Sequence, residues 1–176
     1  MQIVEHFPPH YNSIPDEEQL LFLAGPIQGA PDWQKLATDL VRELQAVAKK
    51  PTLHIANPRR ESIEDEFEYN AQVNWEKVHL KRAKRNGAIL VWFATQDFSL
   101  PYEYGREYAK TTKTELDRII GWKDEVPGMK LYVGIEPGFQ SLSRYKMTCL
   151  DEYDLGKYTT LDSLVHDTFN SLQEAA

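Results

Sequence analysis

The chain has almost no cysteine: Cys149 is the single one among 176 residues. One cysteine excludes an intramolecular disulfide framework and an all-cysteine zinc site, and it fits a reducing compartment. The 5 histidines are scattered and form no HExxH pair, so the sequence shows no metal-ligand spacing. It also has no GxSxG element, the nucleophile elbow of Ser-His-Asp hydrolases. We therefore expect no disulfide, no bound metal and no serine triad.

Long hydrophobic runs and an excess of positive charge are also missing. No apolar stretch approaches the ~18 residues of a membrane span, and residues 1–10 lack the basic and apolar regions of a signal peptide. Lys and Arg total 20 against 27 Asp and Glu, a formal charge of −7. Nucleic-acid polymers and anionic membranes require a basic surface, so neither is expected as a partner. We expect a cytoplasmic protein whose ligand is a small molecule.

The chain alternates short apolar runs with amphipathic segments, and it has no internal repeat or linker. Its length suits one domain spanning residues 1–176. We expect strands at 1–7, 20–24, 53–56, 88–94 and 130–135, and helices at 31–47, 62–87, 101–120 and 160–172. Alternating strands and helices indicate parallel strands. The sequence thus predicts a three-layer α/β fold of about five mainly parallel strands with helices on both faces.

Ligands of such sheets bind beyond the carboxyl ends of the strands, where residues 25–32, 57–60, 95–103 and 136–138 are expected to form loops. In the first loop, Gly25 and Gly29 permit close approach of the backbone to a ligand. A tight strand-to-helix turn that needs glycine and proline explains this loop equally well. The loop is neither GxGxxG nor a Walker sequence, so a dinucleotide or triphosphate site is not expected.

One carboxylate, Glu103, lies at the end of the third expected loop, residues 95–103, where Pro101 is expected to open a helix. A helix dipole favours an ionised carboxylate in the first turn by ~0.3–1 kcal/mol, and such a group can act as a nucleophile. The alternative is the ordinary enrichment of glutamate at helix starts.

A second carboxylate, Glu76, falls at helical spacing inside an apolar stripe formed by Tyr69, Val73, Leu80 and Ala83. An acid in such a stripe must be paired with another group, be protonated, or serve in binding or catalysis, because burying an unpaired charge is costly. In the alternative, the buried face consists of Trp75, Val78 and the stem of Arg82, which leaves Glu76 exposed. His79, one turn further along, is a competing candidate.

Four sequence motifs lie at the expected ends of strands and on the expected helix 62–87. They are Phe22-Leu23-Ala24-Gly25-Pro26-Ile27, Asn57-Pro58-Arg59-Arg60, Trp75-Glu76, and Asp97 followed by Tyr102-Glu103-Tyr104-Gly105. Together they resemble the nucleoside 2-deoxyribosyltransferase family over about residues 20–137. The resemblance implies a flavodoxin-like (Rossmann-like) fold and transfer of 2-deoxyribose between nucleobases. It also implies no metal or organic cofactor, nucleoside and nucleobase as partners, and a homo-oligomer whose active sites borrow residues from a neighbouring subunit.

The resemblance also implies roles for individual residues. By position, Glu103 matches the family's nucleophile and Asp97 matches the aspartate that binds and protonates the nucleobase. The acid that helps to orient the nucleophile falls on Glu76 by motif, or on His79 by ungapped counting, and we prefer Glu76. The residues expected to contact substrate are Gly25, Gln28, Asp32, Trp33, Asn57, Ser99 and Tyr102.

Two other functions remain open. In the related deoxynucleoside-monophosphate N-hydrolases, a phosphate-binding serine tends to occupy the place of Asp97. An aspartate there should repel a 5′-phosphate, so the sequence favours free nucleosides, although Ser99 is near enough to keep the hydrolase hypothesis open. A non-catalytic nucleoside-binding or nucleotide-binding module is the third hypothesis.

Overall fold

A computed structural model describes residues 2–48, 51–60, 68–102, 105–140 and 142–174 of the chain. Within these ranges the elements, in chain order, are β1 (Ile3–His6), β2 (Gln19–Ala24), α1 (Trp33–Ala48), β3 (Leu53–Ala56), α2 (Tyr69–Arg85), β4 (Gly87–Phe93), α3 (Lys110–Glu125), β5 (Lys130–Ile135), α4 (Arg144–Glu152) and α5 (Leu161–Glu174). None of the helices in this part of the chain is long and apolar enough to cross a membrane.

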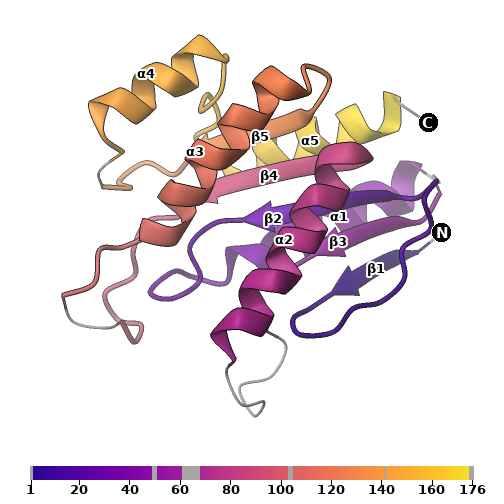
Figure 1. The fold of residues 1–176 in the computed structure, drawn as a ribbon, viewed down its shortest axis with the longest axis horizontal. Coiled ribbons are helices and arrows are strands. Elements are labelled where there is room, and N and C mark those ends of the chain that lie inside the picture. Colours follow the sequence, from indigo (N-terminus) through magenta and orange to yellow (C-terminus); the bar gives the residue numbers. More distant parts are fainter. Residues whose placement is uncertain (1, 49–50, 61–67, 103–104, 141, 175–176) are drawn as a thin grey trace.

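The strands form one sheet, in which every neighbouring pair is parallel. Over the described residues its order is β1-β3-β2-β4-β5. Figure 1 shows helices on both faces of this sheet. The expected α/β fold with a parallel, flavodoxin-like sheet is therefore confirmed.

The chain reverses its direction of travel across the sheet at β2. It passes from β2 to β3 on one side, and then returns to place β4 on the other side of β2. In an open parallel sheet, such a switch point leaves a crevice at the carboxyl ends of the two adjacent strands. The fold therefore predicts a ligand site above Ala24 and Phe93, the last residues of β2 and β4.

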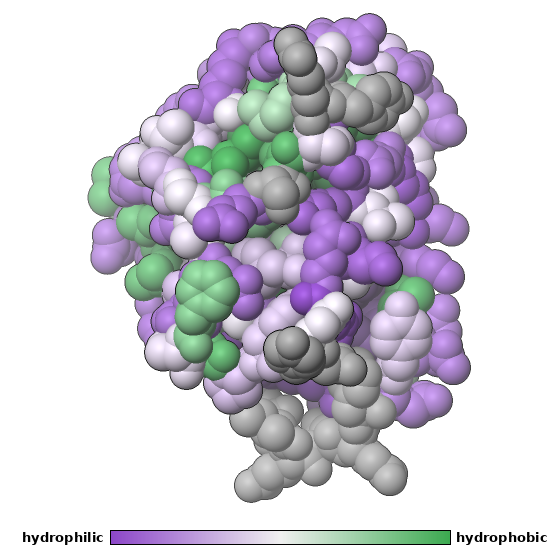
Figure 2. Space-filling view, turned by 90° about the vertical axis from the view of Figure 1, so that its left-hand side faces the viewer, coloured by the Kyte–Doolittle hydropathy of each residue, from purple (hydrophilic) through white to green (hydrophobic). Residues whose placement is uncertain are grey.

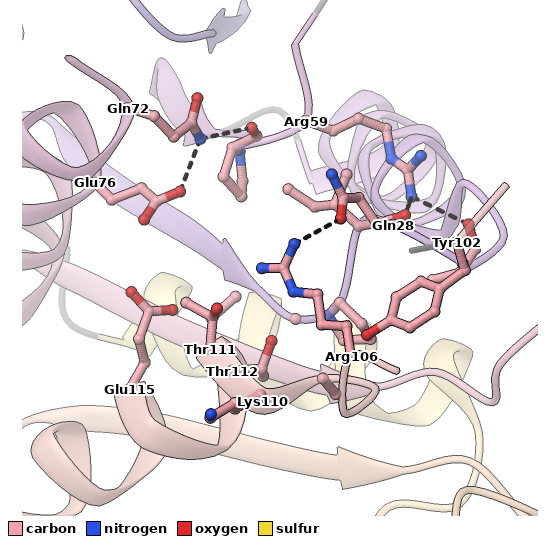
Figure 3. Close-up of a pocket in the computed structure, with 18 of the residues that line it drawn as sticks. Gln28, Arg59, Gln72, Glu76, Tyr102, Arg106, Lys110, Thr111, Thr112 and Glu115 are labelled. Carbon is pink, nitrogen blue, oxygen red and sulfur yellow. Dashed lines mark hydrogen bonds between the residues drawn. The ribbon is translucent and has the colours of Figure 1, made fainter. Parts of the chain in front are cut away.

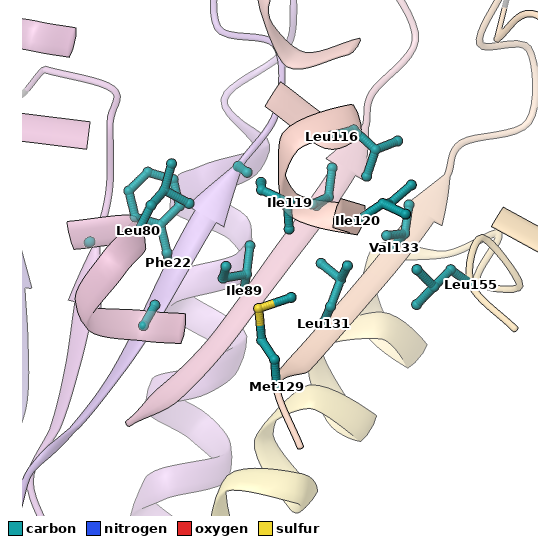
Figure 4. Packing of buried hydrophobic residues seen from close by; sticks show 14 of the residues in the cluster. Phe22, Leu80, Ile89, Leu116, Ile119, Ile120, Met129, Leu131, Val133 and Leu155 are labelled. Carbon is teal, nitrogen blue, oxygen red and sulfur yellow. The ribbon is translucent and has the colours of Figure 1, made fainter. Parts of the chain in front are cut away.

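Alternate residues of the central strands enter two separate cores. Phe22 of β2 packs with residues of α2 and α3, whereas Leu21 and Leu23 pack with residues of α1 and α5. Figure 4 shows the first core, where Leu80 and Ile119 cover the sheet. Because β2 and β4 are buried on both faces, they appear in the sequence as continuous apolar runs, not as alternating ones.

The prediction of a helix starting at Pro101 is wrong. Helix α3 begins at Lys110, after Gly105 with φ 82° and Ala109 with φ 56°. These left-handed backbone conformations interrupt a right-handed helix, and the one at Ala109 is unfavourable for a residue with a Cβ. Glu103 lies outside the described residues, as does the capping arrangement expected at Ser62 and Asp65. Helix α4 was not expected from the sequence.

Candidate active site

A cavity of about 1070 Å³ lies above the carboxyl ends of the strands, between the loops and helices α2 and α3. Figure 2 shows this face of the molecule, where hydrophobic atoms line the bottom of a hollow and hydrophilic side chains surround it. The lining residues are Phe22, Ala24, Gly25, Pro26, Ile27, Gln28, Gly29, Ala30, Pro58, Arg59, Arg60, Gln72, Glu76, Leu100, Pro101, Tyr102, Arg106, Glu107, Ala109, Lys110, Thr111, Thr112 and Glu115.

The loop between β2 and α1 approaches its neighbours so closely that glycine is required. A Cβ on Gly25 would lie 2.4 Å from the carbonyl oxygen of Trp92, and one on Gly29 would lie 2.8 Å from the ring of Tyr102. Gly29 also has φ 68°, which favours glycine. Its carbonyl accepts a hydrogen bond from the Asp97 amide at 2.8 Å, and this bond joins the first and third loops.

Arg59, after β3, fixes the shape of the same loop. Its Nη2 donates to the carbonyl oxygens of Ile27 at 3.2 Å and Pro31 at 3.1 Å, and its Nε donates to Gln34 Oε1 at 3.1 Å. Burial lowers the pKa of the guanidinium below its usual range. Sequence reasoning gave Arg59 no role, although the Asn-Pro-Arg-Arg run at a strand end was the signal that could have found it.

Three residues expected to contact substrate support the loops instead of lining the cavity. Asn57 is buried, and its Oδ1 accepts a hydrogen bond from the Arg59 amide at 3.0 Å. Asp32 accepts a hydrogen bond from the Lys35 amide at 3.1 Å and lies 3.2 Å from Arg59 Nε. Trp33 is 2% exposed, lies in the core, and donates from Nε1 to the Pro26 carbonyl. Their side chains hydrogen-bond the backbone of the loops around the cavity or of the start of α1. They therefore lie near the site, as the sequence predicted, without lining the cavity.

Gly25, Gln28 and Tyr102 do line the cavity. Gln28 Oε1 accepts a hydrogen bond from Arg106 Nη1 at 3.0 Å, and the Tyr102 hydroxyl donates to the Glu107 carbonyl at 2.9 Å. Figure 3 shows Gln28, Tyr102 and Arg106 gathered at one end of the cavity. The contact between Gln28 and Arg106 joins the first loop to the segment that precedes α3, and the contact between Tyr102 and Glu107 lies within that segment.

Asp97 and Ser99 lie next to the cavity but are not among its lining residues. Asp97 Oδ1 accepts hydrogen bonds from the Ser99 hydroxyl at 2.6 Å and from the Ser99 amide at 2.9 Å. These bonds lower the pKa of the Asp97 carboxyl and keep it ionised.

Glu76, on α2, lies at the opposite end of the cavity from Tyr102. Its Oε1 accepts a hydrogen bond from Gln72 Nε2 at 2.7 Å, and the same Nε2 donates to the Pro58 carbonyl. Burial raises the pKa of the Glu76 carboxyl, although the Gln72 hydrogen bond opposes this. The competing candidate His79 is buried against Trp75, with ring centroids 4.0 Å apart, and does not line the cavity.

The buried face of α2 combines the two alternatives considered from its sequence. Trp75, Leu80 and Ala83 are buried, whereas Tyr69 and Val78 are exposed. Glu76 is half-buried at the edge of this face, where α2 turns toward the cavity.

Glu115, on α3, is a cavity acid that sequence reasoning missed. Figure 3 shows its carboxyl group and that of Glu76 pointing toward one another from the two helices. Burial, together with the charge of Glu76, raises the pKa of Glu115 to about 7. Arg118 Nη2, at 3.7 Å, opposes the shift. Nothing in the local sequence separates Glu115 from other helix glutamates, because Glu76, whose charge adds to the effect of burial, lies on a different helix.

The fold and site together define an α/β protein with a polar small-molecule cavity at the switch point of a parallel sheet. Residues 18–116 match the family described as nucleoside 2-deoxyribosyltransferase like. This match covers more than half of the chain, and the chain belongs to that family. No curated protein matches the chain.

Proposed function

We propose that the protein transfers 2-deoxyribose between nucleobases at this cavity. The observation that carries the proposal is that all the described residues that line the cavity, from Phe22 to Glu115, fall inside the segment 18–116 that matches the family. The cavity is therefore made by the part of the chain that resembles nucleoside 2-deoxyribosyltransferases. Its hydrophobic bottom and polar rim suit a nucleobase joined to a hydroxylated sugar.

The proposed reaction is a retaining displacement in two steps. A carboxylate oxygen of Glu103 forms a bond to the anomeric carbon while the glycosidic C–N bond breaks, and the leaving base takes the electron pair. A nitrogen of the second base then attacks the same carbon and releases Glu103. Cavity carboxylates, Glu76 among them, stabilise the positive charge that develops on the sugar.

Asp97 is proposed to stabilise or protonate the leaving base. The two hydrogen bonds from Ser99 favour its ionised form. In this arrangement the ionised Asp97 accepts a hydrogen bond from the base through its second carboxylate oxygen, Oδ2, because both bonds from Ser99 go to Oδ1. Glu76 is proposed to orient the nucleophile from the side of α2.

The test is to incubate the full chain with a deoxynucleoside and a different free base, and to measure the new nucleoside by chromatography. We expect exchange in the wild type, and a loss of at least about a thousandfold in Glu103→Ala, as is typical when a covalent nucleophile is removed. Glu43→Ala, on the exposed side of α1, is the control. Exchange by Glu103→Ala at the wild-type rate would disprove the assignment.

Product analysis in the same assay separates the two reaction types. If deoxyribose is released at the full rate without an acceptor base, the protein is a hydrolase. Light scattering on the same sample tests the homo-oligomer that we also propose.

A further inference from the structure

The carboxyl group of Glu76 is held at one oxygen only. Its Oε1 accepts the hydrogen bond from Gln72 Nε2 at 2.7 Å, and the same Nε2 is anchored to the Pro58 carbonyl at 3.0 Å. Gln72 is buried, so water does not compete for this anchor. No hydrogen bond from the described part of the chain reaches the second oxygen, Oε2. Because the last torsion of a glutamate is broad, one hydrogen bond does not fix the direction of Oε2.

Glu115 faces this carboxylate from α3. Both side chains line the cavity, and Figure 3 shows their carboxyl groups pointing toward one another. Over the described residues, the Glu115 carboxyl accepts no hydrogen bond, and Arg118 Nη2, at 3.7 Å, is beyond hydrogen-bond distance. A half-buried carboxyl group without a donor favours its neutral form, which carries an O–H that can donate. Glu115 is therefore placed to supply the donor that Glu76 lacks.

The surrounding charges decide which of the two carboxyl groups keeps its proton to higher pH. Burial raises the pKa of Glu76, but the Gln72 hydrogen bond and the charge of Arg118 oppose the shift. Burial and then the charge of Glu76 raise the pKa of Glu115 to about 7, and Arg118 opposes this only in part. In the part of the chain that the structure describes, the other charged residues that line the cavity are Arg59, Arg60, Arg106, Glu107 and Lys110.

We propose that the Glu115 carboxyl shares its proton with the Glu76 carboxylate across this end of the cavity, and that Glu115 thereby positions Glu76 for deoxyribosyl transfer. The inference rests on the proposed function, in which Glu76 orients the nucleophile, and it adds a residue that acts through Glu76. Two facing carboxyl groups that share one proton are stable because only one of them carries a charge. When Glu115 loses its proton, the two charges repel and Glu76 turns away from its working position.

The first measurement needs no substrate. The full chain is labelled with ¹³C at the side-chain carboxyl of glutamate, and NMR follows each carboxyl group from pH 4 to pH 9. Glu115→Gln and Glu76→Gln assign the two signals. We expect Glu115 to titrate near pH 7 in the wild type and at a lower pH in Glu76→Gln. Titration of Glu115 at the same pH in both proteins would overturn the carboxyl pair.

The second measurement is kcat for transfer from pH 6 to pH 9, with a donor nucleoside and an acceptor base that keep their ionisation over this range. In the wild type, kcat should fall above about pH 7, by up to about tenfold per pH unit. The amide of Glu115→Gln donates at every pH, so its kcat at pH 6 should stay within about threefold of the wild type and should not fall. Glu115→Ala has no donor, and its kcat at pH 6 should be lower by roughly tenfold to a hundredfold, with little change in KM.

Glu43→Gln, which removes an exposed carboxylate from α1, is the control and should keep the wild-type pH profile. The profile of Glu115→Gln distinguishes positioning from a merely structural role, because a structural role would leave the alkaline fall in place. The same alkaline fall in Glu115→Gln and the wild type would overturn the positioning role. A wild-type kcat in Glu115→Ala would also overturn it.

The two measurements separate this proposal from the proposed function. If transfer occurs and the alkaline fall persists in Glu115→Gln, the proposed function stands and the positioning role is overturned. If no transfer occurs at any pH, the proposed function fails and the positioning role fails with it. The NMR titration still decides in that case whether Glu115 and Glu76 form a pair.

Discussion

Two glutamates from different helices share one end of the cavity, and their environment decides their ionisation. Glu76 and Glu115 are both withdrawn from water, which disfavours the charged form of a carboxyl group. The charge of Glu76 further disfavours the ionised form of Glu115. Near neutral pH, Glu115 is therefore only partly ionised, and the cavity is less negative than its carboxyl groups suggest.

This ionisation has a consequence for stability. Because the pKa of Glu115 rises from 4.5 to about 7 on folding, the folded state binds more protons than the unfolded state between these pH values. The stability that this gives below pH 4.5 is lost as the pH rises through about 7. The amide of Glu115→Gln does not ionise and so carries no buried charge at high pH. We expect this variant to be more stable than the wild type at pH 8, by about 1–3 kcal/mol.

Urea unfolding at pH 5 and pH 8 measures this difference. The advantage of Glu115→Gln should be much smaller at pH 5, and an equal effect at both pH values would contradict the argument. Glu43→Gln, exposed on α1, provides the comparison for loss of an ordinary surface charge.

At the scale of elements, the loop between β2 and α1 takes its shape from a side chain that lies beyond β3. The Arg59 guanidinium donates to backbone carbonyls of this loop and to Gln34 on α1. Arg59 therefore links the loop between β2 and α1, and the start of α1, to the segment that follows β3. The parallel pairing of β2 and β3 makes this possible, because it brings their carboxyl ends to the same edge of the sheet.

Arg59→Met keeps most of the stem and removes the donors. We expect the free energy of unfolding to fall by about 1–3 kcal/mol, since each lost hydrogen bond contributes about 1 kcal/mol and the carbonyl groups are partly buried. Urea unfolding checks this, with Arg85→Met at the exposed end of α2 as the control. Unchanged stability of Arg59→Met would show that the loop holds its shape without the guanidinium.

The limits of the helices show what could be predicted from local sequence. Strands 53–56 and 130–135 lie where the sequence predicted them, because short segments rich in apolar residues between helices are typical of strands. The start of α3 was predicted too early. The left-handed backbone of Ala109 is held by tertiary contacts, since its side chain is buried beside the cavity. A proline pattern contains no information about such contacts.

At the scale of the whole molecule, three buried histidines join the edge strand β1 to β3 and α2. His6 Nε2 hydrogen-bonds His54 Nδ1 at 2.7 Å, and His54 Nε2 bonds the carboxylate of Glu18. The ring of His79 lies 5.9 Å from that of His6. Burial, followed by the charges of His54 and His79, lowers the pKa of His6 to about 4.

This network predicts sensitivity to acid. Between pH 6.5 and about 4 the unfolded His6 is protonated and the folded one is neutral, so the unfolded state binds more protons. We expect His6 to lower the free energy of unfolding by up to about 1.4 kcal/mol per pH unit as the pH falls through this range.

Urea unfolding across the same range, compared with His6→Gln, isolates this contribution from that of the carboxylates. The variant should lose stability less steeply, and His166→Gln, at an exposed site on α5, should follow the wild type. Parallel curves for His6→Gln and the wild type would refute the role of His6.

The amino-acid sequence by itself determined the α/β class, the parallel sheet and the edge at which the cavity lies. These three features follow from apolar runs and helical periodicity. Both are patterns within short segments, and both reflect which residues of a segment are buried. Only the tertiary structure decided which polar groups face the cavity. It moved Trp33 and Asn57 to supporting positions and brought Glu115 and Thr112 into the cavity. The reason is that the burial and pKa of a side chain on α3 depend on α2 and on the loops, which lie far from it in the chain.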